Sequence, residues 1–274
     1  MKKLKSILAL AFVGLVVFSC NKEEVIQPAE QNEVSKEVLQ KIGSLSFNTA
    51  DVKLIKNTRL DGTVEDAYLI EGDIIMTKDQ LFSMDLHGGI TTEQYRTNNL
   101  VSAPRTIRVV GLNSGSSGLT ANMRSGLQTA VNRYNNLRLS INFTLTFTTN
   151  TTGADIVVRR QSGSAGGSAG FPSGGRPFNS ITIFSGLDTA SVGVNSQVAG
   201  HEIGHCIGLR HTDWFSRQSC GGATLNEGTA GVGAVLIPGT PSGFDATSYM
   251  KACFSFSDSG AFNGNDVTAL NFLY

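Results

Sequence analysis

The sequence predicts an α+β fold, in which a sheet and two long helices precede an irregular part of the chain and a closing helix. Several short segments are rich in β-branched residues or alternate apolar with polar residues, a pattern typical of strands. Between and after them, apolar residues recur at helical spacing. Glycine is abundant, with 31 residues among 274, which favours long connecting loops.

The predicted elements of the sheet and its helices follow residue 103. Four segments have the strand pattern: 106–110, 140–148, 154–158 and 181–184. A long helix is predicted at 119–137, where Thr120 can cap the first turn. A second helix is predicted at 198–209, and the closing helix at 266–274 has its apolar residues on one side.

The second helix carries the pattern His-Glu-x-x-His-x-x-Gly-x-x-His. On a helix, His201 and His205 share one face and can bind a single Zn²⁺, and Glu202 lies beside the first of them as a candidate general base. Gly208 can adopt a left-handed conformation that ends the helix, so that the chain turns back and delivers His211 as a third ligand. Three protein ligands leave one position open, which is typical of a catalytic zinc site. A bare His-Glu-x-x-His occurs by chance, but five fixed positions argue against chance.

A methionine follows this motif, after a loop at 237–243 that is rich in glycine and proline. Together they resemble the metzincin zinc proteases, in which a Met-turn comes after the third histidine. Met250 would form an apolar floor below the imidazoles; the alternative is that it is one core methionine among five. Some metzincins carry a tyrosine ligand two residues after the methionine. This chain has Ala252 there, so no tyrosine ligand is expected.

The segment from about 104 to 274 is similar to the HEIGH-type, protease B-like metallopeptidases of bacteria. The resemblance implies a metzincin-like zincin, with a twisted mixed sheet and two main helices above the cleft, and an irregular C-terminal half with the Met-turn and closing helix below. It also implies one catalytic zinc ion bound by His201, His205 and His211, with Glu202 as general base, and hydrolysis of peptide bonds. No cluster of oxygen ligands in the sequence supports structural calcium.

A glycine-rich stretch lies where metzincins have the edge strand that pairs with an extended substrate. Small side chains would let a peptide backbone approach and add as a strand. We expect the substrate contact along five residues: Gly167, Ser168, Ala169, Gly170 and Phe171. The alternative is a flexible loop.

The first residues predict a lipoprotein signal peptide at 1–19. Three lysines precede an apolar run that is too short for a typical membrane span. The run ends in Val-Phe-Ser-Cys, which resembles a bacterial lipobox with Cys20 as the acylated residue. The alternative is an ordinary secretory signal. The following charged residues, 21–24, resemble an export tag, which predicts an outer-membrane lipoprotein exposed on the cell surface; a plain solvated charge run would leave the periplasmic face open.

Between the leader and the zinc-binding region, residues 20–44 are polar and predict a tether, and 45–103 predict a pro-segment that keeps a precursor latent. One motif in the pro-segment resembles the aromatic-x-Gly-Asp of astacin-like precursors, where the aspartate occupies the open zinc position. Here the aspartate is Asp73, Gly72 would allow close approach, and Ile70 replaces the aromatic. The alternative is a plain β-turn.

Three cysteines remain beyond the leader. An oxidising compartment permits one disulfide among them. We favour Cys220 with Cys253, which would link the loop after the third histidine to the loop after the Met-turn; pairing through Cys206 is the alternative. Asp213 is expected either to accept hydrogen bonds from backbone amides or to serve only as a turn residue.

Charge and composition limit the partners. Lys and Arg number 22, as do Asp and Glu, so the net charge of zero argues against nucleic acid as a main partner. The sequence therefore predicts a monomeric, lipid-anchored zinc endopeptidase that acts on protein or peptide and contacts the membrane through Cys20. Two alternatives stay open: a zinc-bearing lipoprotein with an adhesive or glycan-binding role, and a zinc hydrolase of esters.

Overall fold

In a computed structural model, the described residues all fall within Glu33–Tyr274. The described residues are 34–45, 47, 49–59, 62–83, 94–221, 234–241 and 243–274. Cys20 and the predicted leader lie outside them, so the lipidation of Cys20 stays a prediction. Among the described helices, none combines the length and apolarity needed to span a bilayer.

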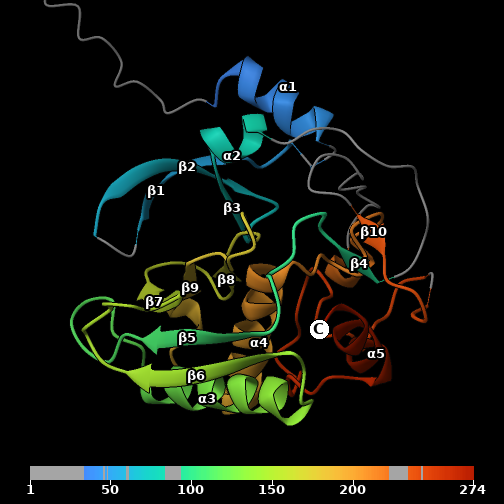
Figure 1. The fold of residues 1–274 in the computed structure, drawn as a ribbon. Helices are drawn as coiled ribbons and strands as arrows, with labels where there is room; N and C mark the ends of the chain where they lie inside the picture. Colours follow the sequence, from blue (N-terminus) through green and yellow to red (C-terminus); the bar gives the residue numbers. More distant parts are fainter. Residues whose placement is uncertain are drawn as a thin grey trace, which may run out of the picture. The chain divides into compact units, whose positions relative to one another are not determined.

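A five-stranded sheet forms the centre of the part that we call the C-terminal domain, residues 94–274 (Figure 1). Four strands are parallel in the order β6–β5–β7–β9, and β8 adds antiparallel at the edge beyond β9. The mixed sheet predicted from the sequence is therefore confirmed. Its strands are β5 (Arg105–Gly111), β6 (Ile141–Phe147), β7 (Ile156–Gln161), β8 (Gly167–Ser168) and β9 (Ser180–Phe184).

Two long helices, α3 (Ala121–Asn136) and α4 (Val192–Ile207), pack against each other and against this sheet. Thr120 caps α3 as predicted, because its Oγ1 accepts a hydrogen bond from the backbone N–H of Met123 at 3.3 Å. Ser191 caps α4 in the same way, so this helix begins earlier than the sequence predicted. The chain closes with α5 (Gly264–Leu273), and one large apolar cluster joins the sheet and the three helices.

The described residues 34–83, which we call the N-terminal segment, form a smaller layer. Its three-stranded antiparallel sheet has the order β1–β2–β3 and is followed by α2. A turn at residues 71–73 joins β2 to β3. The elements are α1 (Lys36–Ser44), β1 (Lys53–Thr58), β2 (Val64–Ile70), β3 (Ile74–Thr77) and α2 (Lys78–Ser83).

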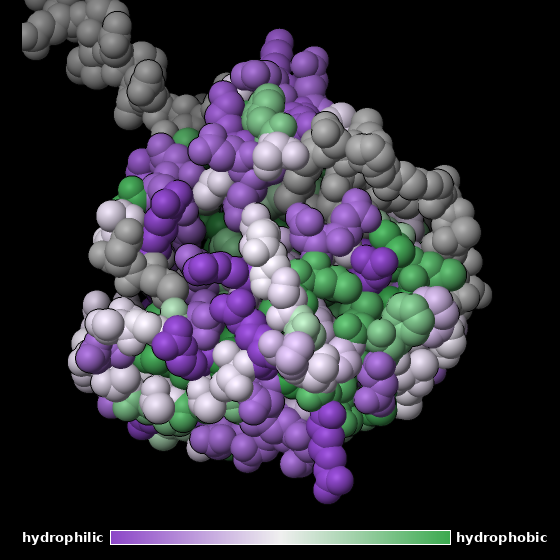
Figure 2. Space-filling model, viewed as in Figure 1, coloured by the Kyte–Doolittle hydropathy of each residue, from purple (hydrophilic) through white to green (hydrophobic). Residues whose placement is uncertain are grey.

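The predicted tether at 20–44 is corrected by α1. Val38 and Ile42 are one helical turn apart and are buried, whereas the outward face of α1 is hydrophilic (Figure 2). Two apolar residues in a short polar sequence were too weak a signal to predict this helix. Among the described residues, regular secondary structure of the N-terminal segment therefore begins at Lys36.

Alternation along β2 and β3 sends side chains to two different cores. Leu69 and Ile75 face the large cluster of the C-terminal domain, whereas Ile70, Ile74 and Met76 face a second cluster with α1 and α2. The second cluster also contains a side chain of the C-terminal domain, Phe171. The N-terminal segment thus has a small core of its own that is completed by its neighbour.

Residues 94–103, which the sequence places in the predicted pro-segment, contact segments of the C-terminal domain. β4 (Tyr95–Arg96) pairs with β10 (Val235–Leu236), and the backbone N–H of Thr97 donates to the carbonyl of Gly208 at 2.7 Å. Gln94 is buried, and its side chain donates to Asp266 at 3.0 Å. These contacts tie the stretch to the metal-binding half of the molecule.

Candidate metal centre and cleft

The three histidines of the motif converge on one point. Gly208 has φ +112° and ends α4, and the chain then returns so that His211 faces His201 and His205. The ring centroids are 4.6 to 5.2 Å apart, and the Nε2 atoms of His205 and His211 are separated by 3.2 Å. The sequence prediction of these three residues as one site agrees with this arrangement.

Backbone carbonyls orient two of the rings. The Nδ1 atoms of His201 and His205 lie 2.9 Å from the carbonyl oxygens of Tyr249 and Leu209, so each ring donates from Nδ1 and directs the Nε2 lone pair into the site. Burial lowers the pKa of His205 well below its usual value, so this ring stays neutral. Neutral imidazoles with converging lone pairs repel unless a cation lies between them, so the donor set fits a divalent metal such as zinc.

Glu202 lies between the histidines and the edge of the sheet. It is 2% exposed, and burial, reinforced by the charge of Asp73, raises the pKa of Glu202 well above its usual range. A side chain on Gly167 would come within 2.6 Å of Glu202 Oε1, so only glycine fits at that point of β8. The carboxylate of Glu202 is thereby placed at the edge strand, where a peptide could lie.

Met250 lies directly below the helix that carries the histidines. It is buried, and a Cβ at Gly204 would come within 2.5 Å of its sulfur, so the glycine between the two histidines of α4 makes room for the methionine. The backbone N–H of Thr212 donates to the Met250 carbonyl at 2.9 Å. The residue predicted as the Met-turn methionine thus packs against the motif helix, and its carbonyl is hydrogen-bonded to the residue that follows the third histidine.

Asp266 fixes the Met-turn, a role that sequence reasoning missed. Its carboxylate accepts hydrogen bonds from Ser248 Oγ at 2.6 Å, Gln94 Nε2 at 3.0 Å, and the backbone N–H groups of Tyr249 and Asn263 at 3.3 and 2.8 Å. Tyr249 in turn orients His201. Burial raises the pKa of Asp266 to about 6, against its hydrogen bonds.

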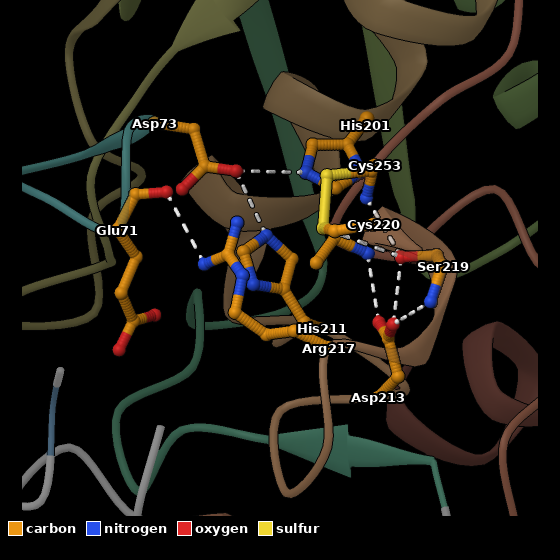
Figure 3. Close-up of a disulfide and its surroundings, with 10 residues drawn as sticks. Glu71, Asp73, His201, His211, Asp213, Arg217, Ser219, Cys220 and Cys253 are labelled. Carbon is orange, nitrogen blue, oxygen red and sulfur yellow. Dashed lines mark hydrogen bonds and ion pairs between the residues drawn. A yellow bond between two sulfur atoms is a disulfide. The ribbon is translucent and has the colours of Figure 1, made fainter. Parts of the chain in front are cut away.

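The loop after the third histidine is joined to the loop after the Met-turn by two links (Figure 3). Asp213 accepts hydrogen bonds from Ser219 Oγ at 2.6 Å and from the backbone N–H of Ala252 at 2.8 Å. A disulfide joins Cys220 to Cys253, the pairing that the sequence favoured, and Cys206 is a buried free thiol. Asp213 therefore takes the first of its two expected roles.

Asp73 of the N-terminal segment completes the cluster (Figure 3). Its Oδ2 lies 2.9 Å from His211 Nε2 and 3.6 Å from His201 Nε2, and the four candidate ligand atoms lie within 4.8 Å of one another. Burial opposes ionisation, but the charge and hydrogen bonds of the histidines outweigh it and hold the pKa of Asp73 well below its usual range. The turn that the sequence offered as an alternative is also present.

The backbone on either side of the same turn forms hydrogen bonds with the predicted edge strand. The N–H of Ala169 donates to the Asp73 carbonyl at 2.7 Å, and the N–H of Ile75 donates to the Ala169 carbonyl at 2.5 Å. A Cβ on Gly170 would come within 2.5 Å of the Ile75 carbonyl, so this approach also depends on glycine. Of the five predicted substrate contacts, Gly167 lines the cavity, whereas Phe171 turns away into the second apolar cluster.

A cavity of about 270 Å³ opens beside the histidines. The C-terminal domain supplies His201 and Glu202 to its wall, together with Arg217 and Lys251, which sequence reasoning did not single out. No motif marks these two cations, because they reach the cavity only through the folding of the irregular loops.

A protein-family model described as dual-action HEIGH metallo-peptidase matches residues 68–274, which is more than half of the chain. Among solved structures, "Structure of Myroilysin" is 17% identical, with 64% of this chain and 82% of that chain covered and a TM-score of 0.41. "Crystal structure of myroilysin" is 14% identical, with 74% and 98% covered and a TM-score of 0.42. No curated protein matches the chain.

Proposed function

This chain belongs to the family of HEIGH metallopeptidases and is a zinc metallopeptidase, and from that premise we propose that it is made as a latent precursor. One observation carries the proposal: the carboxylate of Asp73 lies against His211 and His201, where the fourth ligand of a three-histidine zinc site would be. With that position filled by Asp73, no position is left for the water that hydrolysis requires.

The backbone of the N-terminal segment supports this proposal. Asp73 and Ile75 exchange hydrogen bonds with Ala169, next to the edge strand, and so occupy the backbone groups that an extended substrate would need. The same turn thus blocks both the metal site and the edge strand that would pair with a substrate. Removal of this turn would open both together.

Glu202 would be the general base and acid once the turn is removed. When bound, zinc supplies a Lewis acid that polarises the scissile carbonyl and makes water more acidic. Glu202 would accept the proton of that water and pass it to the leaving amine. The edge strand would hold the peptide, and the carbonyls of Tyr249 and Leu209 would keep the histidine rings in place.

Latency is tested with the uncut, zinc-loaded protein and an Asp73→Ala variant. We expect the variant to hydrolyse casein at least about tenfold faster than the wild type, because loss of one strong ligand is worth at least about 1.4 kcal/mol. Asp79→Ala is the matched control, since Asp79 is an exposed carboxylate of the same segment. Equal latency of the wild type and Asp73→Ala, with equal zinc content, would contradict the proposal.

We also propose that the protein is secreted and anchored to the outer membrane through acylated Cys20, facing the cell exterior. The support is the leader, the lipobox-like sequence and the charged residues that follow it. Mass spectrometry should find acyl chains on Cys20. The Cys20→Ser variant should no longer be found in the membrane fraction. Resistance of the wild type to an added protease on intact cells would argue for the periplasmic face instead.

A further inference from the structure

Charges of opposite sign meet in the cavity beside the histidines. The N-terminal segment brings two acidic residues to its wall, Glu71 and Asp73. The C-terminal domain brings two cations, Arg217 and Lys251. In this partly enclosed space, water screens charge less than at an open surface, so the sign of the wall influences what binds there.

The two cations differ in what they contact. The ammonium group of Lys251 lies 2.9 Å from the carboxylate of Asp258, so its charge is matched within the C-terminal domain. The guanidinium of Arg217 donates to the backbone carbonyl of Glu71 at 3.3 Å, across the boundary to the N-terminal segment (Figure 3). When the N-terminal segment leaves, Lys251 keeps its contact with Asp258, whereas Arg217 loses its contact with the Glu71 carbonyl.

Arg217 is held in place by an unusually constrained backbone. It has φ 45° and ψ 37°, a left-handed conformation that costs a non-glycine residue about 1–2 kcal/mol. Its N–H donates to the Asp213 carbonyl at 2.6 Å, and its carbonyl accepts from the N–H of Cys220 at 2.9 Å. The disulfide from Cys220 then fixes this loop to Cys253, which also lines the cavity. The strained and hydrogen-bonded backbone thus fixes the position of the Arg217 Cα, from which the side chain extends.

We propose that Arg217 is a specificity-determining residue, which binds an acidic side chain of the substrate close to the scissile bond. The inference rests on the proposed function, because it takes the N-terminal segment to occupy the substrate cleft. A guanidinium presents parallel N–H donors that match a carboxylate, and such charge-assisted pairs are stronger than neutral hydrogen bonds. A peptide with glutamine in place of glutamate keeps the shape but loses the charge, so it binds Arg217 more weakly.

The experiment compares peptides that differ only by glutamate against glutamine, at each of the three positions on either side of a cleaved bond. The zinc-loaded Asp73→Ala protein serves as the enzyme. We expect kcat/KM to be about tenfold higher for glutamate at one position, as for other charge-assisted contacts. Arg217→Gln should abolish most of this ratio, and Arg217→Lys should keep part of it.

Arg138→Gln is the matched control. Arg138 is an exposed arginine that also has a positive φ, 57°, but it does not line the cavity. Its substitution changes the same charge on the same type of backbone and should leave the glutamate-to-glutamine ratio unchanged. The proposal is overturned if no position favours glutamate, or if Arg217→Gln retains the full ratio. Casein hydrolysis by the wild type and Asp73→Ala reports on latency separately, so the two failures are distinguishable.

Discussion

The N-terminal segment places a buried aspartate, Asp73, at the metal centre, whereas the C-terminal domain uses a buried aspartate, Asp266, to support the Met-turn, and the two carboxylates are held differently. Asp266 accepts hydrogen bonds from four groups, two of them backbone N–H groups, and supports the Met-turn from behind. Asp73 stands at a turn, and its Oδ2 contacts imidazole nitrogens, while its Oδ1 has no hydrogen-bond partner among the described residues. The first arrangement is built into the domain. The second depends mainly on the metal site itself, so it can be lost without dismantling the domain.

The largest expected effect is the loss of kcat when Glu202, the proposed general base of the C-terminal domain, is replaced. Glu202→Ala should lower kcat by several orders of magnitude, because the proton acceptor is lost, while zinc stays bound by three histidines. His205→Ala should lose both turnover and zinc. Casein hydrolysis by the Asp73→Ala protein gives the rates, and metal analysis gives the zinc content. Loss of zinc from the Glu202 variant would mean that the domain alone does not hold the metal.

The second effect concerns the anchors of the N-terminal segment away from the metal. The Phe47 ring lies 5.0 Å from the guanidinium carbon of Arg210, the buried residue just before His211. Phe47→Ala removes this cation–π contact and a core ring, which together weaken docking of the segment by about 3 kcal/mol. Casein hydrolysis by the uncut protein should therefore rise. Phe82→Ala, at a ring that is 39% exposed, is the control and should leave latency intact. Unchanged latency in both variants would mean that the Phe47 ring does not hold the segment in the cleft.

The sequence predicted the end of the motif helix and the convergence of its histidines, but not where the helix begins, because i and i+4 spacing and the glycine at the helix end act locally. It was also sufficient for the strands of the main sheet, where β-branched residues recur. Asp266, Gln94 and Arg217 could not be predicted, since their positions result from loops that join distant parts of the chain. For α1, only Val38 and Ile42 signal burial, and their partners are supplied by the folded sheet.

A third prediction concerns the pH dependence of the C-terminal domain. Burial raises the pKa of Asp266 to about 6, above its ordinary value of 3.8, so the folded state binds this proton more tightly than the unfolded state. The bound proton contributes up to about 3 kcal/mol to the free energy of unfolding. This contribution is complete below about pH 4 and is lost as the pH rises through 6. The free energy of unfolding of the wild type, minus that of Asp266→Asn, should fall over this range in urea titrations. A flat difference for Asp266→Asn would contradict the assignment.

The smallest effect is expected at the turn that presents Asp73. Glu71 and Gly72 both have positive φ, 58° and 91°, as in the type I′ turns that join antiparallel strands, and asparagine is preferred to glutamate at the first of these positions. Glu71→Asn should stabilise the turn by about 0.5–1 kcal/mol and make the latent form harder to open. The backbone carbonyl that Arg217 contacts is retained in this variant. Two- to fivefold slower appearance of casein-cleaving activity in the Glu71→Asn precursor is the expected result, with Glu65→Asn on β2 as the control that leaves the turn unchanged. Faster activation would mean that the glutamate side chain, rather than the turn geometry, holds the segment in the cleft.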